Sequence, residues 1–459
     1  MPPRPLIRSF HAVLAVGLVA CGSGGGGGGG TPASGVAPNP ALVAISPTGA
    51  PANGQNSFGF ISSDGRWSAF TSVASNLVPG DDAGSMDIFV RDLDGTSITQ
   101  VNRLTPVAPG DAGDRVPGMW FLGGISANGR YVAMGGVPET GSTPSASYRK
   151  DLLTGILLRI AVATGGAPAD DWAIVQAMSE DGRVIAVRTA SPGFSTYDTN
   201  GLDDVYVTVV SADGSAATNE LISRRYDPAG DGYAGIDAAN GSSGTDTIGV
   251  SGDGRYVVYS STATNLVMAD VSDQREVFRH DRDTNRTIRV AVATSVNGEG
   301  NGSSSSPAIS RDGQRVAFLS TSSNLIAGDI LPEPGGDGAP TRVYVRDIAA
   351  GVTRRLTTTG HSFRPTISAD GRWIAFTSSA SDLPHASGAE VLYLYDWNLG
   401  TLKRIDAGAA GFGDHYVQSP SLSADGTRVL FSSSSTNFVP GTHEGHDLFI
   451  LTRAPSGAG

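Results

Sequence analysis

Short runs of alternating apolar and polar residues fill the chain after residue 40, and no segment there shows sustained helical periodicity. Seven of these runs lead into one phrase: an apolar stretch, Ser, any residue, Asp or Asn, Gly, and then a second β-rich run. An Asp-Gly pair between two such runs predicts an antiparallel hairpin, because both turn residues tolerate positive φ. The pattern therefore predicts an all-β protein built from hairpins.

The seven phrases form a long repeat. Their anchor residues are Asp64, Asn128, Asp181, Asp253, Asp312, Asp370 and Asp425. Successive anchors lie 53 to 72 residues apart, a spacing typical of repeat architectures. Each repeat divides into strand a before the Asp-Gly turn, strand b after it, an aromatic strand c such as 87–92, and a short strand d such as 98–101. Four-stranded units repeated radially predict a β-propeller of seven blades.

The two ends of the repeat predict how the ring closes. The last repeat stops after its strand c, at Asp447–Ile450, and Leu42–Ile45 precedes the first anchor without a repeat of its own. We expect Leu42–Ile45 to become the outer strand of the last blade, which removes a free sheet edge. The propeller then spans residues 41–455. The widest gap between anchors contains a polar insertion near Gly230–Thr247, which we interpret as a long loop.

The first forty residues are typical of a leader. Arg4 and Arg8 precede an apolar stretch over 10–20 that is too short to span a bilayer. The stretch ends in Leu-Val-Ala before Cys21, which resembles the bacterial lipobox and implies cleavage before Cys21 and lipid attachment to it. Residues 1–20 are then a lipoprotein signal peptide and residues 21–40 a Gly- and Pro-rich tether. The alternative is an ordinary secretory signal.

Composition adds little beyond this picture. Cys21 is the only cysteine, so no intramolecular disulfide can form. The net charge of −12 argues against a nucleic-acid partner, which would need a basic face. Gly22 after the cysteine favours the outer membrane as the destination of a lipid-anchored protein of the cell envelope.

The Ser-x-Asp-Gly-Arg phrase and a strand c ending in Arg-Asp resemble the WD-like repeats of TolB-type β-propellers, over about residues 41–453. The resemblance implies a propeller of the bacterial envelope. TolB proteins carry an α/β domain before a propeller of six blades, whereas this chain has a tether and seven predicted blades. A role in the Tol-Pal envelope system is therefore not implied.

Residues that recur in every blade are expected to support the fold. We expect the anchors to hold tight turns, and the Arg after the Gly to form an ion pair at a strand edge or between blades. We expect the Asn of a recurrent Asn-Leu loop to bond the backbone of its own loop.

Residues that break the repeat are better candidates for binding. The b–c and d–a loops of a propeller share one face and are long here, so binding should favour that face around the central channel. The candidates on the d–a loops are Arg115, Trp172, Asp246, Phe363, Arg364, His415 and Tyr416. Trp, Arg and Tyr are enriched in binding hot spots. The alternative for each candidate is that it packs its own loop.

For each candidate metal or catalytic motif, a purely structural role explains the residues better. The acidic loops 80–87 and 198–204 are similar to Ca²⁺ loops but lack the EF-hand spacing and its terminal Glu. His443 and His446, with His415, form an incomplete zinc set. The Gly-x-Ser-x-Gly elbow of serine hydrolases is absent. We therefore assign no catalytic residue, no metal ligand and no cofactor, with Ca²⁺ alone left open.

Two functions remain open. The preferred hypothesis is a membrane-tethered, non-catalytic binding scaffold, monomeric, that takes an envelope protein or a glycan. The alternative is a carbohydrate-active enzyme, a glycosidase or polysaccharide lyase, because a catalytic pair cannot be picked out of 44 acidic residues by sequence. Clustered carboxylates in the channel would favour the enzyme, and aromatic and mixed polar residues would favour binding.

Overall fold

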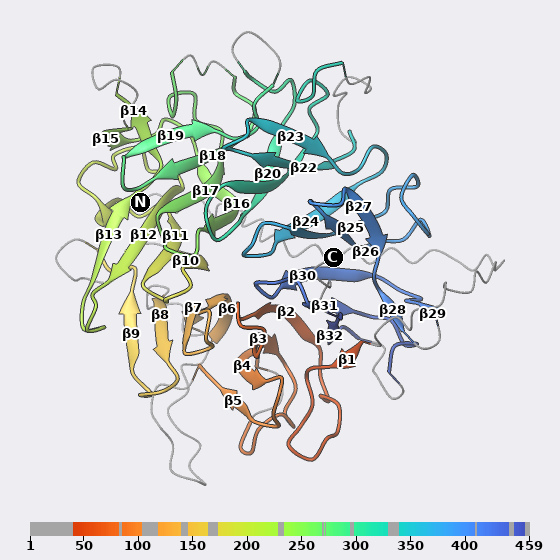
Figure 1. Ribbon diagram of the computed structural model, residues 1–459. Helices are drawn as coiled ribbons and strands as arrows, with labels where there is room; N and C mark the ends of the chain where they lie inside the picture. Colours follow the sequence, from red (N-terminus) through yellow and green to blue (C-terminus); the bar gives the residue numbers. More distant parts are fainter. Residues whose placement is uncertain are drawn as a thin grey trace, which may run out of the picture. The chain divides into compact units, whose positions relative to one another are not determined.

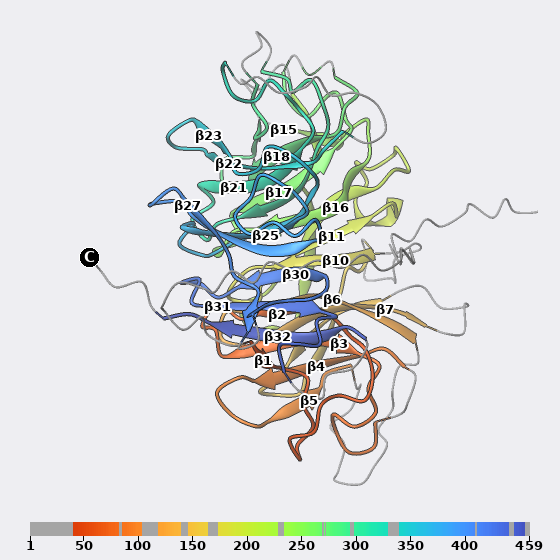
Figure 2. The ribbon, with the colours of Figure 1, turned by 90° about the vertical axis from the view of Figure 1, so that its right-hand side faces the viewer.

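The computed structural model describes residues 40–81, 85–102, 118–138, 146–163, 173–227, 234–268, 270, 272–293, 298–328, 339–408, 411–439 and 445–454. Within them, seven four-stranded antiparallel sheets surround a common centre (Figure 1), which confirms the seven-bladed propeller. Figure 2 shows the same blades edge-on. The leader, with Cys21, lies outside these residues. In the part of the chain described, no helix has the length and apolar character needed to cross a bilayer.

Each blade is a meander whose strands follow one another from the centre outwards. The innermost strands are β2 (Asn56–Ile61), β6 (Gly118–Ile125), β10 (Ala173–Met178), β16 (Ser243–Val250), β20 (Ser304–Ile309), β24 (Ser362–Ile367) and β30 (Val417–Leu422). They begin blades 1 to 7 in that order. The second strands are β3 (Trp67–Ser72), β7 (Tyr131–Pro138), β11 (Val184–Thr189), β17 (Tyr256–Ser261), β21 (Arg315–Ser320), β25 (Trp373–Ser378) and β31 (Arg428–Ser433).

The outer half of each blade follows the same order. The third strands are β4 (Asp87–Asp92), β8 (Ala146–Asp151), β12 (Asp204–Val210), β18 (Glu276–Asp281), β22 (Arg342–Asp347), β26 (Val391–Asp396) and β32 (Asp447–Thr452). The outermost strands are β5 (Ile98–Gln100), β9 (Leu157–Ile160), β13 (Ala217–Leu221), β19 (Arg286–Arg289), β23 (Val352–Arg355), β27 (Thr401–Arg404) and, in blade 7, β1 (Ala41–Leu42).

Closure by the N-terminal strand is confirmed, with a different register. Ala41 pairs with Ile450 and Leu42 with Phe449, and the Val43 N–H donates to the Leu448 carbonyl at 2.8 Å. The expected strand Leu42–Ile45 was therefore placed too far along the chain. The chain leaves the sheet after Val43, and Ile45 forms an isolated bridge with Pro51 instead.

Small elements decorate the blades. The insertion before blade 4 is not a plain loop, because it contains the hairpin β14 (Arg224–Tyr226) and β15 (Ala234–Ala238), and its last residues belong to β16. A second hairpin joins β28 (Ala407–Gly408) to β29 (Gly411–Phe412), and a short 3₁₀ helix η1 covers Pro192–Phe194.

The apolar core lies mainly between neighbouring blades. Every residue of β4 and of β26 is buried, including the charged residues Asp87, Arg91 and Asp92 of β4, because both faces of these strands are covered by neighbouring blades. One cluster joins Phe70 and Phe89 of blade 1 to Leu430 and Leu448 of blade 7. The last and first blades are therefore held together by side-chain packing as well as by β1.

The Ser-x-Asp-Gly turn is stabilised by its own side chains. In blade 4 the Ser251 hydroxyl donates to the Asp253 carboxylate at 2.6 Å, and this carboxylate accepts the Arg255 N–H at 3.0 Å. The Tyr256 N–H donates to Ser251 Oγ at 2.8 Å. The glycine, Gly254, has φ +76°, whereas Asp253 does not have positive φ. The hairpins are confirmed, and in all seven turns the glycine is the residue that uses the positive φ which both residue types tolerate.

The same glycine also lets adjacent blades approach. A Cβ on Gly129 of blade 2 would overlap the ring of Trp67 in blade 1, and a Cβ on Gly313 of blade 5 would overlap the ring of Tyr256 in blade 4. In both cases the first residue of the second strand of one blade packs on the Asp-Gly turn of the next blade.

The arginine after the glycine pairs within its own blade. Arg130 donates to both carboxylate oxygens of Asp151, at 3.0 and 2.7 Å, and holds the pKa of Asp151 down at about 2. The same pairing joins Arg66 to Asp92, Arg255 to Asp281 and Arg372 to Asp396. Arg183 is an exception, because it donates to the Val210 carbonyl. We expected this arginine to form an ion pair either at a strand edge or between blades, and the structure shows the pair at a strand edge.

The asparagine of the Asn-Leu loop does not serve its own loop. Asn76 accepts the Asn53 N–H at 3.0 Å and donates to the Pro51 carbonyl at 2.9 Å. Its partners lie in the loop that leads into the same blade, so this residue ties the two long loops of that blade together.

Candidate functional site

The seven innermost strands enclose a central cavity of about 360 Å³. All blades contribute to its wall, through 58–61, 123–125, 176–178, 247–250, 306–309, 364–367 and 419–421. Its volume falls in the range of small-molecule sites in proteins, about 300–1,000 Å³. The centre of the propeller is therefore the candidate site.

The pairing of each innermost strand shifts at this cavity, by a β-bulge in six blades and by a wider irregularity between Ser243 and Ile248 in blade 4. In four blades, residues other than glycine at the bulge have positive φ: Phe58 (32°), Ser306 (51°), Arg364 (48°) and Ser419 (52°). Such backbone costs on the order of 1–3 kcal/mol per residue and clusters at functional sites. Bulges re-aim side chains, and here they turn them into the channel.

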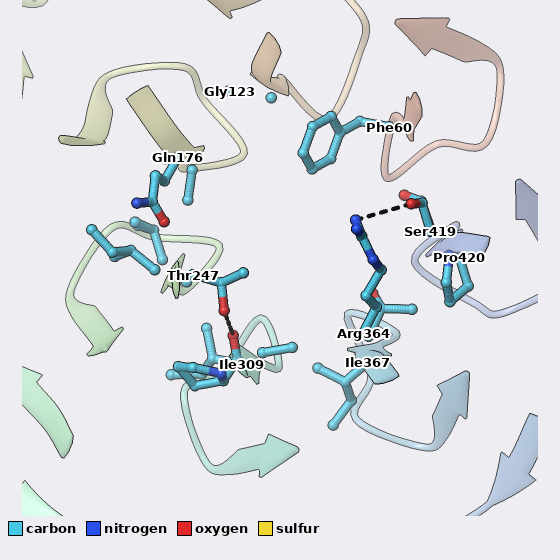
Figure 3. Close-up of a pocket in the computed structure, with 18 of the residues that line it drawn as sticks. Phe60, Gly123, Gln176, Thr247, Ile309, Arg364, Ile367, Ser419 and Pro420 are labelled. Atoms are coloured by element: carbon cyan, nitrogen blue, oxygen red, sulfur yellow. Dashed lines mark hydrogen bonds between the residues drawn. The ribbon is translucent and has the colours of Figure 1, made fainter. Parts of the chain in front are cut away.

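Among the described residues that line the cavity, Arg364 is the only charged one. Its Nη1 donates to Ser419 Oγ at 3.1 Å, and its guanidinium lies 4.9 Å from the centre of the Phe58 ring. Figure 3 shows the side chain reaching towards Ser419 inside the cavity. The cavity walls withdraw water and lower the pKa of Arg364 from its usual value, while the negative charge of Glu390 opposes this.

Arg364 has no acidic partner in the structure as described. Arg372 and Arg404, on the same blade, are paired with Asp396 and Asp406. The charge of Arg364 therefore stays available for a ligand.

The turn end of the cavity carries four isoleucines. Ile61, Ile125, Ile309 and Ile367 stand at the ends of their strands, just before the serine of the Asp-Gly turn, and all line the wall. Figure 3 shows Phe60, Ile309 and Ile367 around the cavity. Arg364 and Ser419 come earlier in their strands. Polar residues also line the rest of the wall: Gln176, Thr247, Ser306, Thr366 and Ser421.

The Asp-Gly turns close one end of the channel with a ring of seven backbone hydrogen bonds. Each turn donates an N–H to a carbonyl of the next, from Asp64 to Ala127 in blades 1 and 2 through to Ala424 and Ser63 in blades 7 and 1. Their lengths run from 2.8 to 3.3 Å. The residue between Ser and Asp in the repeat supplies all the acceptors, which brings these seven residues together in one ring.

Three of these side chains form a bridge across that end. Glu180 of blade 3 accepts the Ser63 hydroxyl of blade 1 at 3.0 Å and pairs with Arg311 of blade 5 at 2.9 Å. Gly252 of blade 4 makes room, since a Cβ there would overlap Arg311. We call Ser63, Glu180 and Arg311 the turn-side bridge.

A second, open hollow that includes Glu180 and Arg311 shares no lining residue with the central cavity. The cavity therefore opens towards the long loops.

Four exposed aromatic side chains lie on or next to innermost strands. Phe58, Phe121 and Phe363 lie on β2, β6 and β24, and Tyr416 immediately precedes β30. Phe363 stacks on His361, with ring centres 6.3 Å apart. Four consecutive blades, 6, 7, 1 and 2, thus each carry an exposed ring on or next to the innermost strand.

The residues singled out by sequence have different fates. Arg364 lines the cavity. Phe363 and Tyr416 are exposed aromatic residues that lie close in sequence to the lining residues Arg364 and Ser419. Asp246 supports the wall instead, because its carboxylate accepts the Ser306 N–H and the Ser260 hydroxyl.

His415 is exposed and its N–H donates to Ser435 Oγ at 3.1 Å, outside the cavity wall. Arg115 and Trp172 lie outside the described residues. Sequence reasoning missed Phe58, Ser419 and the turn-side bridge. The signal for the bridge was present, since Glu180 and Arg311 are the only charged residues at the variable position of the seven turns.

The candidate metal loops bind their own chain where they are described. In the 198–204 loop, Asp198 accepts the Tyr206 hydroxyl at 2.7 Å, and Asn200 donates to Asp204 at 2.8 Å. Across the described segments, no group of three or more His, Cys, Asp or Glu residues is arranged to hold a metal ion. His443 and part of the 80–87 loop fall outside the described residues.

No family model and no curated protein matches this sequence. Solved structures similar to it include an oligogalacturonate lyase in complex with manganese, at 15% identity and a TM-score of 0.47, over 88% of this chain and 91% of that chain. The propeller domain of the trilobed protease from Pyrococcus furiosus has 12% identity and a TM-score of 0.49, over 87% and 94%. A putative TolB from Agrobacterium tumefaciens has 14% identity and a TM-score of 0.39, over 78% and 94%. TolB proteins are thus among the similar folds, as the repeats indicated. These likenesses concern the fold alone.

Proposed function

We propose that this chain is a non-catalytic binding protein of the bacterial cell envelope, held at the membrane by a lipid on Cys21. Its ligand enters the central cavity from the long-loop face. The observation that carries the proposal is a cavity closed at one end, whose wall holds a single unpaired cation, Arg364.

Two further features support binding. The strained bulges at Phe58, Arg364 and Ser419 hold side chains in fixed positions before any ligand arrives, and such preorganisation strengthens binding. The exposed rings of Phe363 and Tyr416 offer additional contact area for a larger ligand or a partner.

The cavity gives less support to the carbohydrate-active alternative. Glycoside hydrolysis uses a pair of carboxyl groups that flank the scissile bond. In the described part of the cavity wall there is no Asp or Glu, and Arg364 is the one ionisable group there. A propeller enzyme would need its acid and base elsewhere.

A cavity-filling substitution tests the function. Thr247 lines the cavity and is exposed to it, so Thr247→Trp should occlude the space. Thr401 is exposed on the outermost strand β27, and Thr401→Trp is the matched control. We would screen a library of organic acids, amines, neutral fragments and sugars by ligand-observed NMR. Binding should be lost in Thr247→Trp and retained in Thr401→Trp.

Two different results would contradict this proposal. Ligands that still bind Thr247→Trp with unchanged affinity would place the site outside the cavity. Turnover of a polysaccharide panel by the unmodified protein, abolished by Thr247→Trp, would replace the binding function with an enzyme.

A further inference from the structure

We propose that the ligand of the central cavity is a carboxylate with a compact apolar tail. The carboxylate is bound by Arg364, and the tail lies against the isoleucines at the turn end of the cavity. This inference rests on the proposed function and specifies the chemical class of its ligand.

The charge of the site selects an anion. A guanidinium has five N–H donors in one plane, and the one hydrogen bond that Arg364 makes in the wall is to Ser419 Oγ. The Phe58 ring lies against the guanidinium, 4.9 Å from ring centre to guanidinium carbon, and limits its orientation. A planar, fixed guanidinium matches the two oxygens of a carboxylate.

The number of charges favours a monoanion over a phosphate. A phosphate monoester carries about −1.5 to −2 charges at pH 7. Here it would meet a single cation, with the carboxyl of Glu390 close enough to act on the same arginine. A carboxylate has one charge and is matched by Arg364 alone.

The isoleucines of the wall favour an apolar tail. Ile367 follows Arg364 by three residues in β24, roughly 10 Å further along a strand. At this depth the wall carries Ile61, Ile125 and Ile309 from other blades. An amphipathic ligand with its acid group at Arg364 would place its tail against the edges that these side chains present to the cavity, because Ile61 and Ile367 otherwise pack between blades. This contact is favourable in proportion to the apolar area removed from water.

The closed end limits the size of the ligand. The turn-side bridge, with Glu180 joined to Ser63 at 3.0 Å and to Arg311 at 2.9 Å, blocks passage through the channel. A polymer therefore cannot thread through it, and the part of the ligand that enters the cavity has the size of a small molecule. The cavity of 360 Å³ equals roughly a dozen water volumes of about 30 Å³ each, which suits a tail of medium length.

Calorimetric titration with octanoate tests the inference, with 1-octanol and octylamine as probes that share the tail. Octanoate should bind more tightly than either. Arg364→Gln should weaken octanoate binding by about 10- to 100-fold, the usual effect of losing a charged hydrogen-bonding partner, and leave 1-octanol unchanged. Arg364→Lys should fall between, because lysine keeps the charge but not the planar fork.

Arg225→Gln is the matched control, since Arg225 is an exposed arginine on the β14–β15 hairpin paired with Asp237. It should leave octanoate affinity unchanged. Melting temperatures of all variants are measured first, because Arg364 has positive φ and its replacement affects the bulge. The Arg364→Lys comparison remains informative even if Arg364→Gln unfolds.

Three results would overturn the inference: no octanoate binding at millimolar concentration, equal affinity for octanoate and 1-octanol, or unchanged octanoate affinity in both Arg364 variants. If Thr247→Trp still abolishes binding of other ligands, the proposed function stands and only the ligand class is wrong. If octanoate binds Thr247→Trp as well as the unmodified protein, the cavity is not the site and both fail.

Discussion

Replacement of Asp204 by Asn should make the propeller more stable at neutral and alkaline pH. Asp204 begins β12 and is fully buried. Its oxygens accept hydrogen bonds from Ser223 Oγ at 2.6 Å and Asn200 Nδ2 at 2.8 Å, and no basic side chain in the described segments pairs with it. Burial raises the pKa of Asp204 from 3.8 to about 7, against the opposing effect of the two hydrogen bonds. The charges of Asp198 and Asp203 add to the rise.

The sign of the pH effect follows from proton binding. Between pH 3.8 and about 7 the unfolded chain has lost this proton while the folded protein keeps it. The free energy of unfolding therefore falls as pH rises through this window and levels off above it. At about 1.4 kcal/mol per tenfold change in proton affinity, the loss is about 4 kcal/mol by pH 8. That is a large share of the about 5–15 kcal/mol by which domains are stable.

Asparagine removes this titration and keeps the shape of the side chain. The free energy of unfolding of Asp204→Asn, relative to the unmodified protein, should rise by about 3 kcal/mol between pH 4.5 and pH 8. Urea unfolding followed by fluorescence at both pH values measures the difference. EDTA is included, so that no divalent cation compensates the carboxylates.

Asp213→Asn on the same blade is the control. Asp213 is exposed in the turn after β12, and hydrogen bonds from Ser211 and Ser215 lower its pKa to about 2. Its replacement should give no relative gain at high pH. If Asp204→Asn changed stability equally at both pH values, Asp204 would not titrate between them and the reasoning would be refuted.

Two other predictions concern the turns and the leader. Gly129→Ala should lower the free energy of unfolding by more than about 1 kcal/mol, because Ala is strained at φ +74° and its Cβ would overlap the Trp67 ring. Gly80→Ala isolates the strain, since Gly80 has φ +71° with nothing within 4 Å of the added Cβ, and equal losses in urea unfolding would contradict blade-to-blade packing at Gly129. Cys21→Ser should move the protein from the membrane to the soluble fraction of cells, and failure of the unmodified protein to incorporate labelled palmitate would rule out the lipoprotein assignment.

The blade count could be read from the sequence because the repeated turn depends on neighbours within five residues. Ser251, Asp253 and Tyr256 satisfy one another's polar groups without help from the rest of the fold. The same local chemistry occurs in all seven turns, so the number of turns gave the number of blades. The orphan strand at the start of the propeller similarly indicated the closure.

The details of pairing depended on distant parts of the chain. The register of β1 is set where Val43 and Ala44 are buried against blades 1 and 7, and this moved the strand to Ala41–Leu42. Asn76 found its partners in the preceding long loop, about two dozen positions away at Asn53 and Pro51. From the sequence alone, near and distant groups are equally plausible hydrogen-bond partners for such a side chain. The side chain does not encode how many residues separate it from its partner.

The candidate site shows the same division. Sequence singled out Arg364 because it breaks the repeat, but its position in the cavity comes from the bulge in β24, where φ is 48°. The bridge of Glu180 with Ser63 and Arg311 joins alternate blades, and only ring closure brings those blades face to face. The sequence by itself determined the strands, the turns and their number, since these rest on contacts between near neighbours. The tertiary structure decided which side chains meet at the axis, because that depends on packing seven separate blades into one ring.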